Sequence, residues 1–336
     1  MNRRLTNRRP VSPELADGPV RLSTISDFAI DVRTYLTRTP RQLPSRYFYD
    51  PLGSALFDAI CRLPWYRITR SETRLIADHA RAVFGHLEPL AQIVELGSGS
   101  GDKLATLVEA GRRAEDPLEV HLVDVSAAAL ARSADTLGVF DGVDVFTHQM
   151  LYEDGLEKVR HGRSRAGRTL ALFLGSNIGN FDQPAAAGLL RRIRLALGSG
   201  DAFLLGADLV KPERELLLAY DDPLGVTAAF NRNLLVRLNR ELGADIHLGS
   251  FEHRAEWRPE HSRVEMHLVS TRPQRLRIPV AGLDFTMNAG DKIWTESSYK
   301  YEPAAIVAML TSAGFRQRDQ WIDPDARFAL TLVDVK

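Results

Sequence analysis

The stretch best suited to chemistry is a glycine-rich turn at residues 97–101, which reads Gly-Ser-Gly-Ser-Gly. The apolar run Ile93–Leu96 before the turn predicts a strand, and Leu104, Leu107 and Val108 after it have the i, i+3, i+4 spacing of a helix. Glycine tolerates a positive φ and has no side chain, so the backbone of such a turn can approach a ligand closely. The glycine spacing alone fits a plain structural turn equally well.

Two acidic residues favour a ligand-binding turn. Glu95 lies just before the first glycine, and a second predicted strand, Val120–Val123, is followed by Asp124. An acidic residue at the end of the second strand, about 20 or more residues after the glycines, accepts hydrogen bonds from ribose hydroxyls. Dinucleotide enzymes and S-adenosylmethionine enzymes share this arrangement. The acidic pair and the absence of the third dinucleotide glycine favour S-adenosylmethionine.

A second loop with polar groups follows the fourth predicted strand, at residues 175–180, which read Gly-Ser-Asn-Ile-Gly-Asn. In a doubly wound sheet this position lies beside the switch in strand order, where substrates meet the cofactor. The amide oxygen of Asn180 can accept a hydrogen bond from a substrate amine. An ordinary turn rich in asparagine and glycine is the alternative interpretation.

The composition limits the class of protein. The chain has 336 residues with 43 basic and 43 acidic side chains, so a large nucleic-acid-binding field is not expected. Its one cysteine, Cys61, excludes an intrachain disulfide and lies in an apolar helical run, where a buried structural thiol is expected. No apolar run approaches the length of about 18 residues that a membrane span needs. We therefore expect a cytoplasmic monomer with no membrane partner, no nucleic-acid partner and no metal.

Predicted strands and helices alternate between residues 71 and 210, which is the pattern of an α/β fold with a doubly wound, Rossmann-like parallel sheet. The polar, proline-bearing residues 1–24 are expected to form a disordered tail. The predicted strands of the sheet are Ile93–Leu96, Val120–Val123, Asp144–Thr147, Thr169–Leu174 and Ala202–Ala207.

The alternation stops after Asp208, where two helices and a set of antiparallel-looking strands follow. The simplest interpretation is a smaller α+β substrate-binding lobe, formed by residues 25–70 plus 211–300. The Rossmann-like domain would then comprise residues 71–210 plus 301–336. The later predicted elements are helices Glu213–Tyr220 and Val226–Leu242, strands Phe251–Glu256, Val264–Ser270, Leu276–Val280 and Asp291–Thr295, a helix after Glu302 and a strand at Arg327–Val333.

The segment before the alternating region carries helix-start signals and aromatic residues. Ser54 is a candidate N-cap for a helix at Ala55–Arg62, and Thr69 with Glu72 has the spacing of a capping box. The aromatic side chains either pack in a core or form the hydroxyl-bearing wall of a pocket for a small cationic or aromatic substrate. They are Tyr47, Tyr49, Trp65 and Tyr66.

Taken together, these segments resemble the histidine-specific Nα-methyltransferases of ergothioneine biosynthesis, which use S-adenosylmethionine. The resemblance extends from about residue 25 to the end of the chain, and its first and last motifs are the most specific. The matching segments are Tyr47–Asp50, Gly53-Ser54, Leu56-Phe57, Leu63-Pro64, Tyr66, Thr69-Arg70, Glu72, Glu95–Gly99, Phe173–Ser176, Ile178–Asn180, Tyr220, Gly225–Thr227, Phe230-Asn231, Asn233, Thr295-Glu296, Ser298 and Lys300.

The resemblance implies a role for each residue at the amino and carboxylate ends of a free L-histidine substrate. Tyr66 and Asn180 would hold the α-amino group, with Tyr49 close by through a water molecule, and these three would be the catalytic set. Tyr220 would hold the carboxylate. The resemblance also implies a class I methyltransferase sheet and a substrate that lies between two lobes.

The imidazole ring would be bound by Glu296 and Ser298, with Met266 against its face. The carboxylate of Glu296 can accept the imidazole N–H, and the hydroxyl of Ser298 can donate to or accept from the other ring nitrogen. Residues two apart share one face of an extended segment, which suits this pair. The alternative for Glu296 is a solvated surface charge.

On the cofactor side the resemblance implies that Gly97 and Lys103 lie by the first turn and that Asp124 binds the ribose. Family members often have an aspartate and an aromatic residue after the third strand, near the adenine. This chain has His148-Gln149-Met150-Leu151-Tyr152 there, and the amide oxygen of Gln149 could replace the acid. The expected cofactor-binding residues are Gly97, Gly99, Lys103, Asp124, Gln149 and Met150.

The expected reaction is stepwise trimethylation of the α-amino group of histidine to hercynine. Methyl transfer to an amine is an in-line displacement, so the enzyme mainly has to align the nitrogen, the methyl carbon and the sulfur. One alternative is a methyltransferase for another aromatic amino acid such as tryptophan, although an indole pocket would not need the Glu296 carboxylate. A non-catalytic S-adenosylmethionine-binding protein is a further alternative.

Overall fold

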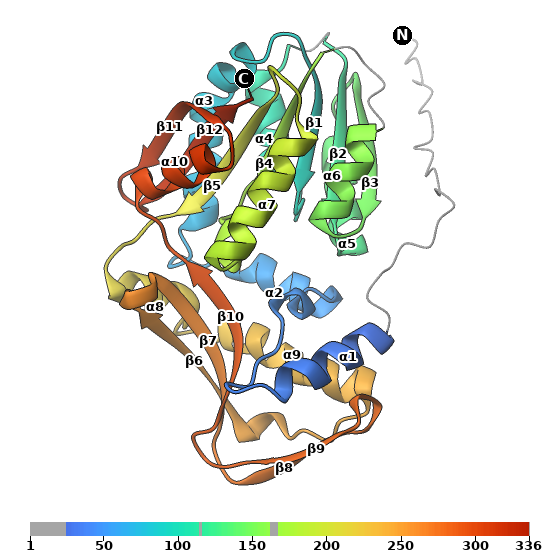
Figure 1. The fold of residues 1–336 in the computed structure, drawn as a ribbon, viewed down its shortest axis with the longest axis vertical. Coiled ribbons are helices and arrows are strands. Elements are labelled where there is room, and N and C mark those ends of the chain that lie inside the picture. The colour runs from blue at the N-terminus through green and yellow to red at the C-terminus, as the bar shows by residue number, and fades with distance from the viewer. Residues whose placement is uncertain (1–24, 114–115, 162–166, 336) are drawn as a thin grey trace, which may run out of the picture.

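The computed structural model describes residues 25–113, 116–161 and 167–335, so the predicted tail at residues 1–24 lies outside the described residues. A seven-stranded sheet in the order β11-β12-β5-β4-β1-β2-β3 forms one half of the molecule, at the top of Figure 1. Its strands are β1 (Leu90–Leu96), β2 (Leu118–Asp124), β3 (Val143–Gln149), β4 (Arg168–Phe173), β5 (Ala202–Asp208), β11 (Arg316–Asp323) and β12 (Phe328–Asp334).

The strand order confirms the predicted doubly wound α/β sheet. β1 pairs in parallel with both β2 and β4, so the chain reverses its direction of winding between β1 and β4. Ligands of open α/β sheets bind outside the carboxyl ends of the strands at such a switch point. β12 runs antiparallel to β5, and β11 forms the edge of the sheet.

Helices cover both faces of this sheet. One face packs against α3 (Ile68–Gly85), α4 (Asp102–Gly111) and α5 (Ala127–Leu137), and the other packs against α6 (Tyr152–His161), α7 (Gln183–Ala196) and α10 (Pro303–Ser312). The central strands are buried on both faces, which explains their continuous apolar runs. None of the helices in the described ranges is long and apolar enough to cross a membrane.

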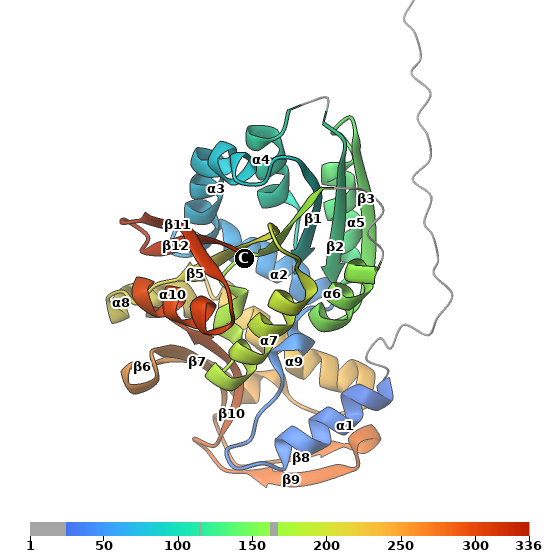
Figure 2. The same cartoon turned by 45° about the horizontal axis from the view of Figure 1, so that its top comes forward.

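The other half of the molecule combines helices with two small antiparallel sheets (Figures 1 and 2). A three-stranded sheet has the order β10-β7-β6, and a separate hairpin is formed by β8 and β9. Its elements are α1 (Ile25–Leu36), α2 (Pro51–Arg62), α8 (Glu213–Tyr220), α9 (Val226–Leu242), β6 (Phe251–Arg258), β7 (Arg263–Ser270), β8 (Gln274–Ile278), β9 (Leu283–Met287) and β10 (Lys292–Tyr299).

Two predicted helix starts are wrong. Helix α2 begins at Pro51 rather than after Ser54, because the Asp50 carboxylate accepts the Gly53 N–H at 2.7 Å and Pro51 occupies the first helical position. Helix α3 begins at Ile68 with Arg67 as its N-cap residue and no side-chain capping bond, so Thr69 and Glu72 do not form a capping box. By contrast, Ser126 caps α5 as its side-chain type suggests.

Asp50 also ties α2 to α9. Its carboxylate accepts hydrogen bonds from Asn233 Nδ2 and Arg240 Nη2, both at 2.7 Å. Burial alone would raise the pKa of Asp50, but the hydrogen bonds from Arg240, Gly53 and Asn233 lower it. The stabilisation from this carboxylate is therefore present above its unfolded pKa and is lost as the pH falls through its lower folded pKa.

Replacing Asp50 tests this junction. Asp50→Ala removes a cap and leaves Asn233 and Arg240 without their acceptor, so we expect a loss of about 2–4 kcal/mol in the free energy of unfolding at neutral pH. Urea denaturation followed by circular dichroism measures this loss. Asp284→Ala, which breaks an exposed ion pair with Arg275 on the β8–β9 hairpin, is the matched control and should leave the midpoint unchanged. Equal midpoints for both variants would contradict the assigned role of Asp50.

Candidate functional site

A pocket lies where the carboxyl end of β4 meets the three-stranded sheet. Its floor includes the loop after β4, and its walls come from the turn before α2, from α8 and from the strands β7 and β10. All seven predicted substrate residues line it, namely Tyr49, Tyr66, Asn180, Tyr220, Met266, Glu296 and Ser298. The other lining residues are Phe57, Ile60, Gly175, Ser176, Asn177, Ala219, Thr227 and Phe230.

A β-bulge in β10 aims two of these side chains into the pocket. Trp294 pairs with His267, but Glu296 pairs with Met266, so the strand carries one extra residue at Thr295. A bulge of this kind shifts every later side chain to the opposite face of the strand. Without it, Glu296 and the residue two positions on, Ser298, would face away from the pocket.

Contacts on both sides hold the bulge in place. Trp294 Nε1 donates to the backbone carbonyl of Glu296 at 2.8 Å, and Thr295 Oγ1 donates to the carbonyl of Met266 at 3.0 Å. The guanidinium of Arg263 stacks over the Trp294 ring at 4.6 Å. The backbone of Arg41 and of Leu43 pairs with Trp294 from the other edge. The bulge is therefore fixed by side chains as well as by the sheet.

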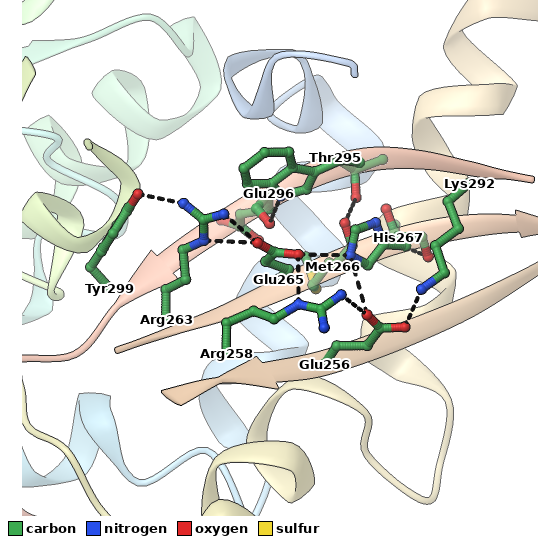
Figure 3. A network of polar contacts seen from close by, with 12 residues as sticks. Glu256, Arg258, Arg263, Glu265, Met266, His267, Lys292, Thr295, Glu296 and Tyr299 are labelled. Atoms are coloured by element: carbon green, nitrogen blue, oxygen red, sulfur yellow. Dashed lines mark hydrogen bonds and ion pairs between the residues drawn. The ribbon is translucent and has the colours of Figure 1, made fainter. Parts of the chain in front are cut away.

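The face of the sheet that points away from the pocket carries a dense ion-pair network (Figure 3). Glu256, Glu265 and His267 have potential metal-ligand atoms within 4.8 Å of one another. Each carboxylate is already neutralised, because Lys292 and Arg258 pair with Glu256 while Arg263 and Arg258 pair with Glu265. We therefore interpret this cluster as a clamp on the register of β6, β7 and β10 rather than as a metal site.

The wall of the pocket nearest α2 is aromatic. The rings of Tyr49 and Phe57 lie edge to face at 5.7 Å, and those of Tyr66 and Tyr220 at 6.4 Å. Burial raises the pKa values of Tyr49 and Tyr66 well above the ordinary value of a phenol. Both phenols are neutral at physiological pH, so they can donate and accept hydrogen bonds but hold no preformed phenolate base.

Glu296 presents an unpaired carboxylate to the pocket. Within the described ranges, no side chain or backbone group forms a hydrogen bond or an ion pair with its carboxylate oxygens. Burial raises the pKa of Glu296 to about 7, and the charge of Lys300 partly opposes this rise. A half-buried acceptor that has no partner among the described residues is suited to a ligand that supplies an N–H donor.

The predicted cofactor residues gather at the adjoining ends of β1, β2 and β3. Gly97 has φ +81°, and a Cβ there would lie 2.9 Å from Asn177 Nδ2, so the turn needs glycine at this position. The Asp124 carboxylate accepts from Ser126 N at 2.9 Å and from Gly99 N at 3.5 Å. The backbone N–H of Met150 donates to the Asp124 carbonyl at 3.2 Å, and Gln149 Nε2 donates to Val125 O at 3.2 Å.

Lys103 is held by a residue outside the predicted site. Its ammonium donates to the carboxylate of Glu72, which also accepts the Gly175 N–H at 2.8 Å. Glu72 is fully buried. Through these two contacts it links α3 to both the first turn and the loop after β4. Nearby, burial raises the pKa of Glu95 to about 8, and its Oε2 atom has no partner among the described residues.

These groups fit S-adenosylmethionine. A buried carboxylate oxygen that lacks a donor, in Glu95, suits an ammonium group, and the tight turn at Gly97 leaves room for a ligand against the backbone. Asp124, at the end of β2, stands where a ribose-binding carboxylate is expected.

Sequence reasoning assigned no site role to several residues that the structure places here. Phe57 and Phe230 complete the aromatic wall, and Tyr152 approaches the first turn with its hydroxyl 3.2 Å from the position of a Cβ on Gly97. Glu72 and Lys300 carry buried charge next to the two ligand positions. All of them except Tyr152 lie in the motifs that carry the resemblance, which is the signal that pointed to them.

The sheet order, the glycine turn with its acidic partner and the adjoining pocket define a class I S-adenosylmethionine-dependent methyltransferase. The model of the SAM-dependent, histidine-specific methyltransferase family matches residues 28–335. The chain belongs to this family.

Relatives in the family match nearly the whole chain. It is 40% identical over 303 residues to the histidine N-alpha-methyltransferase of Mycolicibacterium smegmatis, covering 90% of this chain and 93% of that protein. It is 38% identical to the protein of the same name from Mycobacterium tuberculosis, with the same coverage. It is also 28% identical to ergothioneine biosynthesis protein 1 of Neurospora crassa, over 84% of this chain and 32% of that longer protein.

The hydrogen bond from Trp294 that holds the bulge can be tested by removing a single N–H group. Trp294→Phe keeps a ring for Arg263 but removes the N–H that holds the Glu296 carbonyl, so we expect histidine to bind about fivefold more weakly, as for one lost hydrogen bond. Isothermal titration calorimetry measures the dissociation constant. Trp321→Phe, on the edge strand β11, is the matched control and should bind histidine normally. Unchanged binding in both variants would show that the Trp294 N–H does not position Glu296.

Proposed function

We propose that this enzyme methylates the α-amino group of free L-histidine three times to give hercynine, an early step of ergothioneine biosynthesis. The observation that carries the proposal is one pocket in which the Glu296 carboxylate, unpaired among the described residues, faces neutral phenols and the Asn180 amide beside the cofactor-binding turn. The names of the relatives support the same substrate and position of methylation.

Each end of histidine meets a chemically matched group in this proposal. The Glu296 carboxylate accepts the imidazole N–H, the Ser298 hydroxyl binds the other ring nitrogen and Met266 packs on the ring. Tyr220 binds the carboxylate. Tyr66 and Asn180 hold the α-amino group, with Tyr49 reaching it through water.

The chemistry needs a neutral amine aligned with an electrophilic carbon. When bound, S-adenosylmethionine supplies a methyl group on a positively charged sulfur. Asn180 and Tyr66 would hold the amine with its lone pair directed toward the cofactor side, which is a proximity effect. The amine proton leaves to water, because the raised pKa values of Tyr49 and Tyr66 keep both phenols protonated. The aromatic faces tolerate the fixed positive charge that builds up with methylation.

The division of labour between the two halves is part of the proposal. Residues 25–70 plus 211–300 would form the histidine-binding lobe, and residues 71–210 plus 301–336 the methyltransferase domain, with Gly97, Gly99, Lys103, Asp124, Gln149 and Met150 on the cofactor. We also propose that the enzyme acts as a cytoplasmic monomer without nucleic acid or membrane. The balance of 43 basic and 43 acidic side chains supports the absence of a nucleic-acid partner.

Product analysis tests the proposal directly. The enzyme is incubated with S-adenosylmethionine and a panel of free amino acids that includes tryptophan, and the products are followed by mass spectrometry and proton NMR. We expect mass gains of one, two and three methyl groups on histidine alone, all on the α-nitrogen. Methylation of a ring nitrogen, or turnover of tryptophan at a similar rate, would overturn it.

The titration of Glu296 gives a second test. Ionised Glu296 is the better acceptor for an imidazole N–H, and its pKa of about 7 means that this form is gained as the pH rises through neutrality. Histidine should therefore bind wild type about 10- to 100-fold more tightly than Glu296→Gln at pH 8, but only slightly more tightly at pH 5.5. Free histidine is the same in both measurements, so its titration in solution cancels in the ratio of the two dissociation constants.

The effect of Glu296→Gln on the stability of the folded protein can also be predicted, and it serves as the control for folding. An acid whose folded pKa is raised weakens the folded state above its unfolded pKa, so Glu296→Gln should not lower the thermal midpoint at pH 8. Glu302→Gln, outside the pocket at the start of α10, is the matched variant for binding. A wild-type to Glu296→Gln ratio that stays constant with pH would contradict the assigned contact.

A further inference from the structure

A lysine with no assigned role stands directly behind the substrate pocket. The side chain of Lys300 is fully shielded from solvent, and its ammonium lies 2.7 Å from Tyr220 Oη, 2.9 Å from Ser298 Oγ and 3.0 Å from Asp208 Oδ2. Tyr220 and Ser298 both line the pocket, but Lys300 does not. The lysine therefore acts on any ligand through these two hydroxyl groups and through its charge.

The count of hydrogen-bond donors fixes what the two hydroxyls can do. An ammonium has three N–H donors and no acceptor, so Lys300 uses all three on Tyr220, Ser298 and Asp208. Each hydroxyl thus accepts from Lys300, and the two lie 2.7 Å apart, so one O–H fills the contact between them. The other O–H has to find its acceptor in the pocket. The pair is consequently a donor site.

The charge behind this donor site is positive. Asp208, at the carboxyl end of β5, pairs with both Lys300 and Lys211, whose Nζ lies 2.6 Å from Asp208 Oδ1. Two ammonium groups share this one carboxylate, so Asp208 alone does not neutralise both of them, and burial lowers the pKa of Lys211. Burial opposes the charge on Lys300, but the Tyr220 hydroxyl and Asp208 outweigh this effect and raise its pKa, so the lysine stays charged at any physiological pH.

We propose that Lys300 is the residue that makes the enzyme select amino acids with a free carboxylate over the corresponding amines. Its ammonium occupies one lone pair of each hydroxyl, which leaves the free O–H of the pair, placed on Tyr220 in this proposal, to donate to the carboxylate. It also supplies the positive charge that a carboxylate needs when it leaves water. This inference rests on the proposed position of the substrate carboxylate at Tyr220. It adds a specificity-determining residue that does not itself contact the substrate.

The test compares histidine with histamine, which has the same ring and amine but no carboxylate. The Michaelis constant for histidine and the inhibition constant of histamine are measured for wild type, Lys300→Met and Lys211→Met. Lys300→Met should raise the constant for histidine about 10- to 100-fold while the constant for histamine changes less than about threefold. Lys211→Met removes an equal charge from the same aspartate without touching either hydroxyl, so its effect on histidine reports the loss of charge alone and should be smaller than that of Lys300→Met.

Other outcomes overturn the inference. Equal weakening of histidine and histamine by Lys300→Met would show a merely structural lysine, and equal constants in wild type and Lys300→Met would show no role at all. S-adenosylmethionine binding by calorimetry identifies folded protein. If Lys300→Met fails that check, Lys300→Gln, which keeps N–H donors without the charge, has to show the same selective loss for histidine.

The two proposals can fail separately. If product analysis places methyl groups on a ring nitrogen, the proposed function is wrong, but the difference between histidine and histamine still reports the carboxylate contact. If hercynine forms and Lys300→Met keeps the wild-type preference, the reaction is as proposed and the assignment of Lys300 is wrong.

Discussion

The structure depends on keeping the half-buried Glu296 carboxylate at the pocket without a partner among the described residues. Water would solvate this group if it lay on the open face of the sheet, and its pKa would then be ordinary. The bulge at Thr295, the Trp294 N–H and the ion pairs on the reverse face together direct it inward. Removal from water raises the pKa of this carboxyl group to about 7, and the charge of Lys300 opposes the rise. A ligand that donates an N–H satisfies this acceptor, and a ligand that cannot donate leaves it without a hydrogen bond.

The same principle extends to the cofactor side, where Glu95 is buried with one oxygen unpartnered. Lys103, by contrast, is already neutralised by Glu72, which also holds the Gly175 N–H. The protein groups that connect the two ligand positions thus have hydrogen-bond or ion-pair partners. Some of the groups that line those positions have none among the described residues. Satisfied contacts such as Glu72 fix the distance between the first turn and the loop after β4. Unsatisfied ones define where each ligand binds.

Much of the Rossmann-like sheet could be predicted from the sequence, because its buried strands read as continuous apolar runs separated by helical patterns. Strands β9 and β11 were missed. The first four side chains of β9 alternate between partial and full exposure, and β11 is mostly exposed or half-buried and carries charges along the edge of its sheet. The start of α2 was misplaced because Asp50 and Pro51 read as a turn when their contacts with α9 are unknown.

The site itself was predicted from the family resemblance and from the period of two between Glu296 and Ser298. That period explains why the pair shares a face, but it cannot say which face, because a single extra residue at Thr295 decides this. The pairing of Glu72 with Lys103 and of Lys300 with Asp208 was also beyond sequence reasoning. These partners are far apart along the chain, and only the fold brings their opposite charges into contact.

Repeated methylation gives a reason for anchoring the substrate at the ends that do not react. Each transfer replaces an N–H donor on the amine, so contacts of that nitrogen with Asn180 weaken from one round to the next. In the proposed orientation the imidazole and the carboxylate are unchanged throughout, and they would face Glu296 and the hydroxyl pair backed by Lys300. An enzyme of this design can keep the same substrate orientation over three transfers while the amine loses its donors. The aromatic wall of Tyr49, Phe57 and Phe230 then accepts the methyl groups and the permanent charge without requiring a hydrogen bond.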